Sequence, residues 1–176
     1  MGWHGVAIEP IKEVYQKLVK NRKCLAINGC IAAKTGKEYF RVISGKSEML
    51  SGLIREYDPK HLKRIPNSVK NDGGEVKDIE IKSYNFNDLL EKVNIIEADY
   101  VNIDTEGAEY NILKSIDFER VHVSVLSVEN NYSDYRIPKL MAKNGFELCA
   151  IVGDDDIYRN NKHMAKGLPQ NMRKIR

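Results

Sequence analysis

Hydrophobic and polar positions along the chain alternate between strand-like and helix-like spacing. An apolar run over residues 5–10 predicts a short buried strand. The apolar positions that follow have the three- and four-residue spacing of an amphipathic helix, and they are Ile11, Val14, Tyr15, Leu18 and Val19. Pro10 suits the first turn of this helix, because the amide that proline lacks has no partner there.

The same alternation continues to the end of the chain. Further strands are predicted over residues 24–28, 38–43, 76–82, 98–104, 121–129, 146–152 and 156–159, and helices over 87–93, 110–116 and 135–144. Gly153 and Asp154 separate the last two strands and favour an antiparallel hairpin. The order of elements predicts an α/β sheet with helices on both faces and a C-terminal hairpin.

One segment interrupts this order. From Ser44 to Gly74 the periodicity fades into Gly, Ser, Lys, Pro and Asn, and the strongest turn signal is Asn71-Asp72-Gly73-Gly74. We expect a long loop here. Loops of this length in a compact domain are usually functional or mobile.

Composition narrows the class of protein. The 176 residues match one domain, with 42% hydrophobic and 30% charged residues and three cysteines without a C-x-x-C pair. No apolar stretch approaches the about 20 residues that span a bilayer, and no signal peptide is visible. We therefore expect a cytoplasmic protein, without a membrane partner, in a reducing compartment.

The net charge of +3 is distributed unevenly. Residues 160–176 hold five basic residues and no acid, so the rest of the chain has 23 Lys and Arg against 25 Asp and Glu. This balance argues against a nucleic-acid partner. We expect a domain over residues 1–159 and a basic, flexible tail over 160–176, which could also touch an acidic partner.

Acidic residues end three of the predicted strands: Glu9, Asp104 and Glu129. Ligands of α/β sheets bind at the carboxyl ends of strands, so the coincidence indicates a site there. Glu9 stands where nucleotide-binding domains place the carboxylate that accepts the ribose hydroxyls. It could equally stabilise the dipole of the following helix.

A second acidic group surrounds Asp104. Asp104, Glu106 and Glu109 lie within six residues, with Gly107 giving the backbone room to turn. These carboxylates could serve as a general base, a hydroxyl-binding cluster or ligands of a hard metal. Support of a helix dipole would account for Glu106 but not easily for all three.

These segments resemble the FkbM family of S-adenosylmethionine-dependent methyltransferases. The most specific match is the D-x-E-G-x-E pattern within NIDTEGAEYNIL at Asn102–Leu113. Other matching segments are Gly2–Pro10, Leu18–Arg22, Ser51–Leu53, Ser127–Asn130 and Gly153–Arg159. The resemblance therefore runs over nearly the whole chain, from Gly2 to Arg159.

The resemblance implies a Rossmann-like class I methyltransferase domain that binds S-adenosylmethionine. Glu9 would hold the ribose, and the residues after the second visible strand would flank the adenine; these are Asn28, Gly29, Cys30 and Ile31. Asp104 would lie at both cofactor and acceptor and, with Glu106, would be catalytic. The implied acceptor is a hydroxyl of a sugar or a small natural product, and its choice is expected to lie in the 44–74 segment.

One feature departs from the family pattern. The family begins with a strand and a glycine-rich turn, whereas none of the 12 glycines here forms a G-x-G. We expect the domain to lack its first strand and helix, as a truncated product, a fragment or a degenerate paralogue. The alternative function is a non-catalytic methyltransferase-like module that binds a partner through an exposed sheet edge or the basic tail.

A metal hypothesis also follows from the strand ends. Asp104, Glu129 and Asn130, with Glu106, resemble the acidic and amide ligands that hold magnesium in cation-dependent O-methyltransferases. The competing interpretation is unrelated loop acids. The hypothesis requires the Asp104 and Glu129 carboxylates to lie close together. The four histidines share no ligand spacing.

Overall fold

The structure is a computed structural model and describes residues 4–161. The first residues of the segment that resembles the FkbM family, Gly2 and Trp3, lie outside this range. Nearly all of the predicted basic tail also lies outside it. The architecture is mixed α/β, as the order of elements predicted.

Ten strands form three hydrogen-bonded sheets in the described part of the chain. One four-stranded sheet has the order β7 (Glu97–Ile103), β8 (His122–Glu129), β10 (Asp155–Asn160) and β9 (Phe146–Val152). A second sheet has the order β3 (Cys30–Ile31), β6 (Val76–Tyr84), β4 (Gly36–Ile43) and β5 (Gly52–Leu53). The third is the parallel pair β1 (Val6–Glu9) and β2 (Leu25–Asn28).

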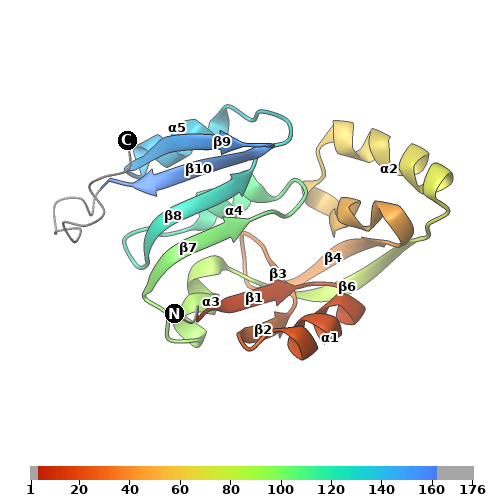
Figure 1. Ribbon diagram of the computed structural model, residues 1–176, viewed down its shortest axis with the longest axis horizontal. Helices are drawn as coiled ribbons and strands as arrows, with labels where there is room; N and C mark the ends of the chain where they lie inside the picture. The colour runs from red at the N-terminus through yellow and green to blue at the C-terminus, as the bar shows by residue number, and fades with distance from the viewer. Residues whose placement is uncertain (1–3, 162–176) are drawn as a thin grey trace.

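The four-stranded sheet contains the predicted hairpin. β10 pairs antiparallel with both β9 and β8, while β7 pairs parallel with β8. Helices α4 (Glu109–Ser115) and α5 (Arg136–Lys143) lie behind this sheet in Figure 1. The main core forms between them, where Leu126 and Val128 of β8 and Met141 of α5 are each 0 % exposed.

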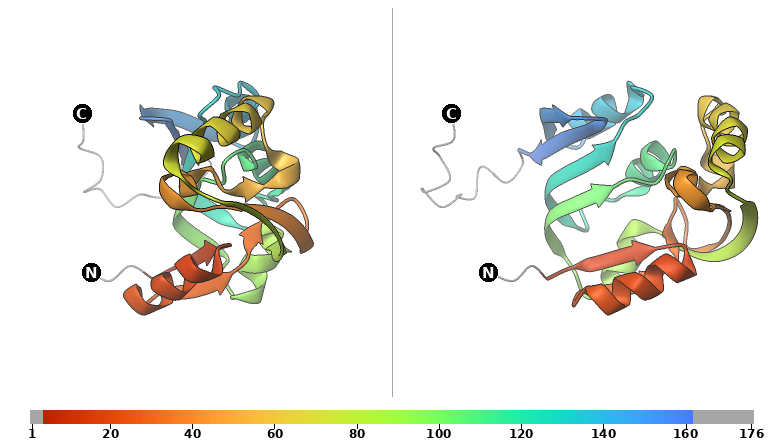
Figure 2. Two further views of the ribbon diagram at one scale, coloured as in Figure 1. Left: turned by 90° about the vertical axis from the view of Figure 1, so that its right-hand side faces the viewer. Right: turned by 45° about the vertical axis from the view of Figure 1, so that its right-hand side comes forward.

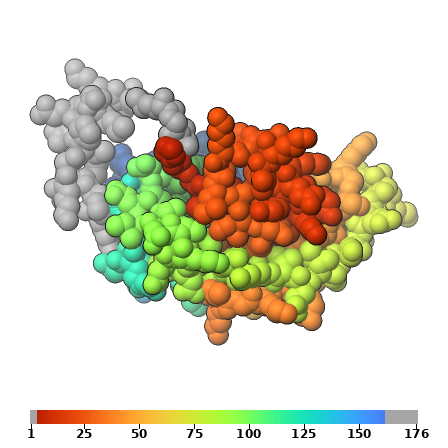
Figure 3. Space-filling model, turned by 90° about the horizontal axis from the view of Figure 1, so that it is seen from below, coloured from red at the N-terminus to blue at the C-terminus, as the bar shows by residue number. Residues whose placement is uncertain are grey.

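The N-terminal elements form a separate two-stranded sheet with one helix. Helix α1 (Lys12–Asn21) connects β1 to β2, and Asn28 pairs with Glu9 at the ends of the two strands. Figure 3 shows this red and orange segment beside the green α3 (Phe86–Lys92). Among the described residues no backbone pairing joins β1 to β7. The predicted absence of an initial strand and helix stays a prediction.

β1 and β7 nevertheless run in the same direction. Their arrowheads point to the same side of the molecule in Figure 1 and in the right-hand view of Figure 2. Each is parallel to its sheet neighbour. The carboxyl ends of β1, β2, β7 and β8 therefore face one side, which is where the strand-end acids lie.

The prediction of a loop from Ser44 to Gly74 was wrong. This segment forms the short 3-10 helices η1 (Gly45–Leu50) and η2 (Ile54–Glu56), with strand β5 between them, and then α2 (Pro59–Asp72). α2 has clear end signals, because Asp58 accepts the amide of Lys60 at 2.7 Å and Gly73 closes the helix at a φ of 69°. The proline Pro66 inside the helix is a strong breaker signal and explains the misinterpretation.

α2 stands on the side to which the β7 and β8 arrowheads point (Figure 1). It covers a small second core, in which Ile43, Leu50, Tyr57 and Ile65 are buried. The segment between β4 and β6 is thus a packed substructure beside the strand ends. None of the helices within residues 4–161 combines the length and apolar character needed to cross a membrane.

Candidate functional site

Three carboxylates meet at the ends of β7 and β8. Asp104 follows β7 directly, Glu106 lies two residues further on, and Glu129 is the last residue of β8. One carboxylate oxygen from each lies within 4.8 Å of the other two. Two of the three predicted strand-end acids, Asp104 and Glu129, therefore lie in one cluster with Glu106, and Glu9 is not a member of it.

The loop that presents Asp104 and Glu106 is held by the third acid of the motif. Glu109 accepts hydrogen bonds from the backbone amide and the hydroxyl of Thr105, both at 2.8 Å, and from the amide of Gly107 at 3.0 Å. Its side chain is almost fully buried. Glu109 therefore holds the loop in place through these hydrogen bonds. Asp104 and Glu106 do not take part in them and face Glu129.

Backbone geometry explains why glycine follows Glu106. Gly107 has a φ of 120°, and a Cβ built there would lie 2.8 Å from the carbonyl oxygen of Glu56. Glu106 itself has a φ of 56°, which is uncommon for a residue with a side chain. This turn sends the Glu106 side chain toward α2 and Glu129, and strain of this kind is typical of functional sites.

The electrostatics of the cluster favour bound protons. Burial, then the charge of Asp104, raises the pKa of Glu106 to about 7, and Arg64 opposes this rise. Burial and the neighbouring carboxylates raise the pKa of Glu129 to about 8. Burial also raises the pKa of Asp104, against the effect of its hydrogen bond with Glu129. Carboxyl groups with such values can exchange protons near neutral pH.

Glu9 lies at the end of β1, as predicted. Its Oε1 accepts the amide of Ile11 at 2.7 Å, so one oxygen supports the start of α1. Burial raises the pKa of this half-buried carboxyl group. A carboxylate has about four acceptor positions, so Glu9 can support the helix and still accept hydroxyl donors.

The first two residues predicted to flank an adenine, Asn28 and Gly29, make contacts that stabilise the fold. The amide of Asn28 donates to the carbonyls of Glu9 at 2.9 Å and of Pro10 at 3.1 Å, which ties the ends of β1 and β2 together. A Cβ at Gly29 would lie 2.7 Å from the carbonyl oxygen of Lys82, so only glycine lets the connection between β2 and β3 approach β6 this closely.

The next two residues enter the core. Cys30 is 6 % exposed, and burial raises the pKa of its thiol to about 12, so it is an inert packing residue. Ile31 pairs with Tyr84 of β6. A ligand at this turn would meet backbone and the exposed neighbours rather than the Cys30 side chain.

Asn130 lies next to the carboxylate cluster but is used elsewhere. Its amide donates to Asp156 Oδ2 at 2.9 Å, and its Oδ1 accepts the backbone amide of Asp134 at 2.7 Å. The structure therefore brings Asp104 and Glu129 together and adds Glu106. Both polar atoms of the Asn130 side chain already take part in hydrogen bonds within the fold.

Sequence reasoning missed the α2 side of the site. His61 is fully buried, and its Nδ1 lies 3.4 Å from Glu106 Oε2. Arg64 interacts with Glu106, and Tyr132 lies three residues after Glu129. The helix-start signal Asp58-Pro59 could have placed His61 and Arg64 on one helix. Nothing in the spacing indicated that this helix packs on the strand-end loops.

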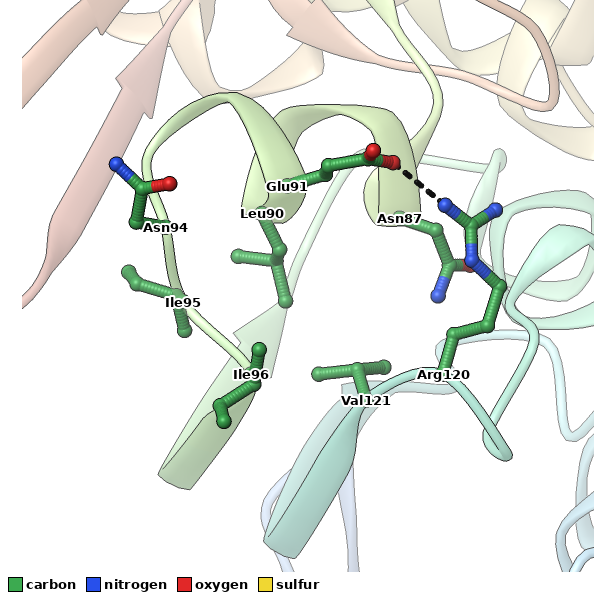
Figure 4. Close-up of a pocket in the computed structure, with 8 residues that line it drawn as sticks. All are labelled: Asn87, Leu90, Glu91, Asn94, Ile95, Ile96, Arg120 and Val121. Carbon is green, nitrogen blue, oxygen red and sulfur yellow. Dashed lines mark hydrogen bonds and ion pairs between the residues drawn. The ribbon is translucent and has the colours of Figure 1, made fainter.

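The site is distinct from a hollow at the opposite ends of the same strands. This cavity of about 400 Å³ lies between α3 and the segments that precede β7 and β8 (Figure 4). It is lined by Asn87, Leu90, Glu91, Asn94, Ile95, Ile96, Arg120 and Val121. An ion pair of 2.6 Å joins Arg120 to Glu91 across it. None of the predicted site residues lines this cavity.

A mixed α/β fold with carboxylates at the ends of parallel strands is consistent with a methyltransferase-like protein. Comparison with known families identifies the family. The family model described as the methyltransferase FkbM domain matches residues 1–156, so the chain belongs to the FkbM methyltransferase family. No curated protein and no solved structure matches the chain.

Proposed function

We propose that this protein transfers a methyl group from S-adenosylmethionine to a hydroxyl group of a sugar or a small natural product. The observation that carries the proposal is the cluster of Asp104, Glu106 and Glu129 at the carboxyl ends of two parallel strands. S-adenosylmethionine supplies an electrophilic methyl group when bound. A hydroxyl that accepts this group must lose a proton, and a carboxylate beside it can take that proton.

The proposed roles follow the exposure of the carboxylates. Asp104 is the exposed member of the cluster, so an acceptor hydroxyl arriving from solvent can reach it. Glu106 is 14 % exposed and lies behind it, toward α2. We assign Asp104 and Glu106 to the acceptor hydroxyl and its proton. Orienting that hydroxyl in line with the methyl donor supplies much of the rate in reactions of this type.

The cofactor half of the site is proposed at β1 and β2. Glu9 would accept the ribose hydroxyls with the acceptor positions that Ile11 leaves open, and the Asn28–Ile31 turn would lie beside the adenine. The chemistry of Glu9 fits this role, because ribose hydroxyls that donate to the carboxylate would replace hydrogen bonds to water that its burial removes. The parallel pairs β1–β2 and β7–β8 support a Rossmann-like arrangement for these strands.

The test begins with binding. Isothermal titration calorimetry of this chain with S-adenosylmethionine should give a saturable signal, and Glu9→Gln should weaken binding about tenfold or more, because hydrogen bonds to charged groups contribute about 1.5–3 kcal/mol. The matched control is Glu13→Gln, an exposed acid in the first turn of α1, which should bind as the wild type does.

Turnover then separates the two functional classes. Transfer of an isotope-labelled methyl group to a panel of sugars and hydroxylated small molecules should be detectable and should fall strongly in Asp104→Asn. A chain that neither binds the cofactor nor methylates any acceptor would instead be a non-catalytic methyltransferase-like module, and the proposal would be withdrawn.

A further inference from the structure

A buried histidine lies behind the carboxylate cluster. His61 is in the first turns of α2 and is 0 % exposed. The ring of Tyr57 stacks on it with a centroid distance of 4.7 Å and an interplanar angle of 12°. Complete burial and stacking on Tyr57 hold the imidazole in one orientation, so the directions of its two nitrogens are defined.

Each imidazole nitrogen faces a different element. His61 Nε2 lies 3.1 Å from the carbonyl oxygen of Leu50, which also accepts the hydroxyl of Tyr57 at 2.9 Å. A carbonyl oxygen only accepts hydrogen bonds, so Nε2 carries a hydrogen and donates. His61 Nδ1 points the other way, toward Glu106 Oε2 at 3.4 Å and the hydroxyl of Tyr132 at 3.3 Å. An imidazole nitrogen without a hydrogen and a carboxylate oxygen are both acceptors, so the contact between Nδ1 and Oε2 requires one proton, carried by Nδ1 or by Glu106.

The Glu106 carboxylate needs a hydrogen-bonding partner on the side that faces His61. Its Oε2 is buried and makes no hydrogen bond with any other described residue. A buried carboxylate oxygen without a hydrogen-bonding partner is unfavourable, and His61 Nδ1 is the one basic group within ion-pairing distance of this oxygen among residues 4–161. The left-handed backbone at Glu106 is what aims the oxygen at the imidazole.

We propose that His61 is a positioning residue: it fixes the Glu106 carboxylate from behind and links the segment from η1 to α2 to the methyl-transfer site. The contact joins three regions, since Leu50 ends η1, Glu106 follows β7 and Tyr132 follows β8. A shift of α2 would therefore change the contact between His61 and Glu106. The role in catalysis rests on the proposed function, whereas the contact itself does not.

The consequence concerns the acceptor. The 44–74 segment is expected to govern acceptor choice, and α2 within it stands beside the strand ends (Figure 1). The His61 side chain lies between α2 and Glu106. An acceptor that binds against α2 would therefore also change the orientation of the carboxylate that takes its proton. The effect of changing His61 should thus appear in kcat and in the KM of the acceptor, and not in the affinity for S-adenosylmethionine.

Two substitutions separate positioning from simple packing. An Asn side chain can place its amide near the Nδ1 position of histidine, and a Gln side chain can reach the Nε2 position. If contact with Glu106 is what counts, His61→Gln should lose about 10- to 100-fold in kcat, as expected for an orienting residue, and His61→Asn should retain more. Equal losses, or better retention in His61→Gln, would overturn the proposal.

A matched control uses another histidine of the chain. His122 lies on β8 and contacts Ser124, away from the carboxylates, so His122→Gln should leave kcat unchanged. Cofactor titration of the same variants should give the wild-type affinity. Thermal unfolding of each variant shows whether it has folded.

Nuclear magnetic resonance tests the contact without any activity and without a His61 variant. In ¹⁵N-labelled protein, Glu106→Gln should move the Nδ1 resonance of His61 more than any resonance of the other three histidines. An unchanged Nδ1 resonance would refute the contact. If the resonance moves but the wild type methylates nothing, the link between α2 and Glu106 stands and the proposed function fails.

Discussion

At the scale of single residues, the D-x-E-G-x-E pattern divides its acids between two tasks. Glu109 is consumed by hydrogen bonds to Thr105 and Gly107, whereas Asp104 and Glu106 face Glu129. All three acids carry a carboxylate, so their chemistry does not distinguish them. The turn at Gly107 decides that Glu109 holds the loop while Asp104 and Glu106 join the cluster. The cluster concentrates negative charge that the protein must neutralise with protons, cations or Arg64.

The pH dependence of stability is the first consequence. The pKa values of Glu106 and Glu129 rise from 4.5 to about 7 and about 8 on folding. The folded state thus binds more protons than the unfolded state between about pH 4.5 and pH 8, so stability falls as pH rises through this window. Melting temperature measured from pH 5 to pH 8.5 should decline, and Glu129→Gln should flatten the decline.

Other charges face the cluster and set the size of this effect. They are Asp155 of β10, Glu109 of α4, and His61 and Arg64 of α2. Arg64→Gln should steepen the decline, because a compensating positive charge is lost. A melting temperature that rises from pH 5 to pH 8 would show that these carboxyl groups do not hold protons in the folded protein.

Metal binding is a second prediction at this scale. If the cluster holds a hard cation, Mg²⁺ added to protein treated with a chelator should bind with measurable heat and raise the melting temperature above pH 7. Glu129→Gln should abolish the heat. Asn130→Ala should retain it, because the Asn130 amide is engaged with Asp156 and Asp134. Absence of any heat in the wild type contradicts a magnesium site.

At the scale of elements, α2 is the part that connects the site to the rest of the fold. Its N-terminus depends on the Asp58 side chain, which caps the amide of Lys60. The helix buries His61 and Ile65 and leaves most of its other side chains exposed. The position of α2 therefore depends on a short cap and a few packing contacts.

Removing the cap should loosen α2 selectively. Asp58→Ala should lower the free energy of unfolding by about 1 kcal/mol in urea denaturation. Turnover should fall further than affinity for the cofactor, because α2 carries His61 to Glu106. Asn67→Ala, an exposed position on the same helix, should stay within about 0.5 kcal/mol of the wild type. Equal effects of the two substitutions would contradict this view of α2.

At the scale of the whole molecule, the proposed cofactor and acceptor residues come from different sheets. Glu9 and Asn28 end the pair β1–β2, while Asp104 and Glu129 end strands of the four-stranded sheet. No strand pairing connects β1 and β7 in the described residues. A ligand that contacts both sets would therefore order these two parts relative to one another.

Hydrogen exchange can detect that ordering. Addition of S-adenosylhomocysteine, the product of the proposed cofactor, should slow amide exchange at the ends of β1 and β2 and in the 103–107 loop. Exchange in β9, an edge strand of the four-stranded sheet that carries none of the proposed site residues, should stay unchanged and provides the internal control. Protection restricted to residues around the cavity in Figure 4 would place the ligand at the opposite ends of the strands.

Much of the fold could be predicted, because strand and helix periodicity is a local property. The strand expected over 98–104 is β7 at Glu97–Ile103, and the expected hairpin is β9–β10. The strand β3 has only two residues, which is too short to show a period. Helix α2 was not predicted because Pro66 in its interior is a helix-breaking signal. The strand-end acids were found because parallel strands bring their carboxyl ends to one side.

The periodicity of the chain and its acidic motif are sufficient to predict the α/β class, the FkbM family and the carboxylates at three strand ends. Which acids meet, and what lies behind them, depends on tertiary packing. Tyr132 and His61 are 71 residues apart in the chain, and no spacing rule connects them. The turn at Gly107 and the packing of α2 place His61 beside Glu106, because burial and hydrogen bonding depend on contacts between distant segments rather than on local pattern.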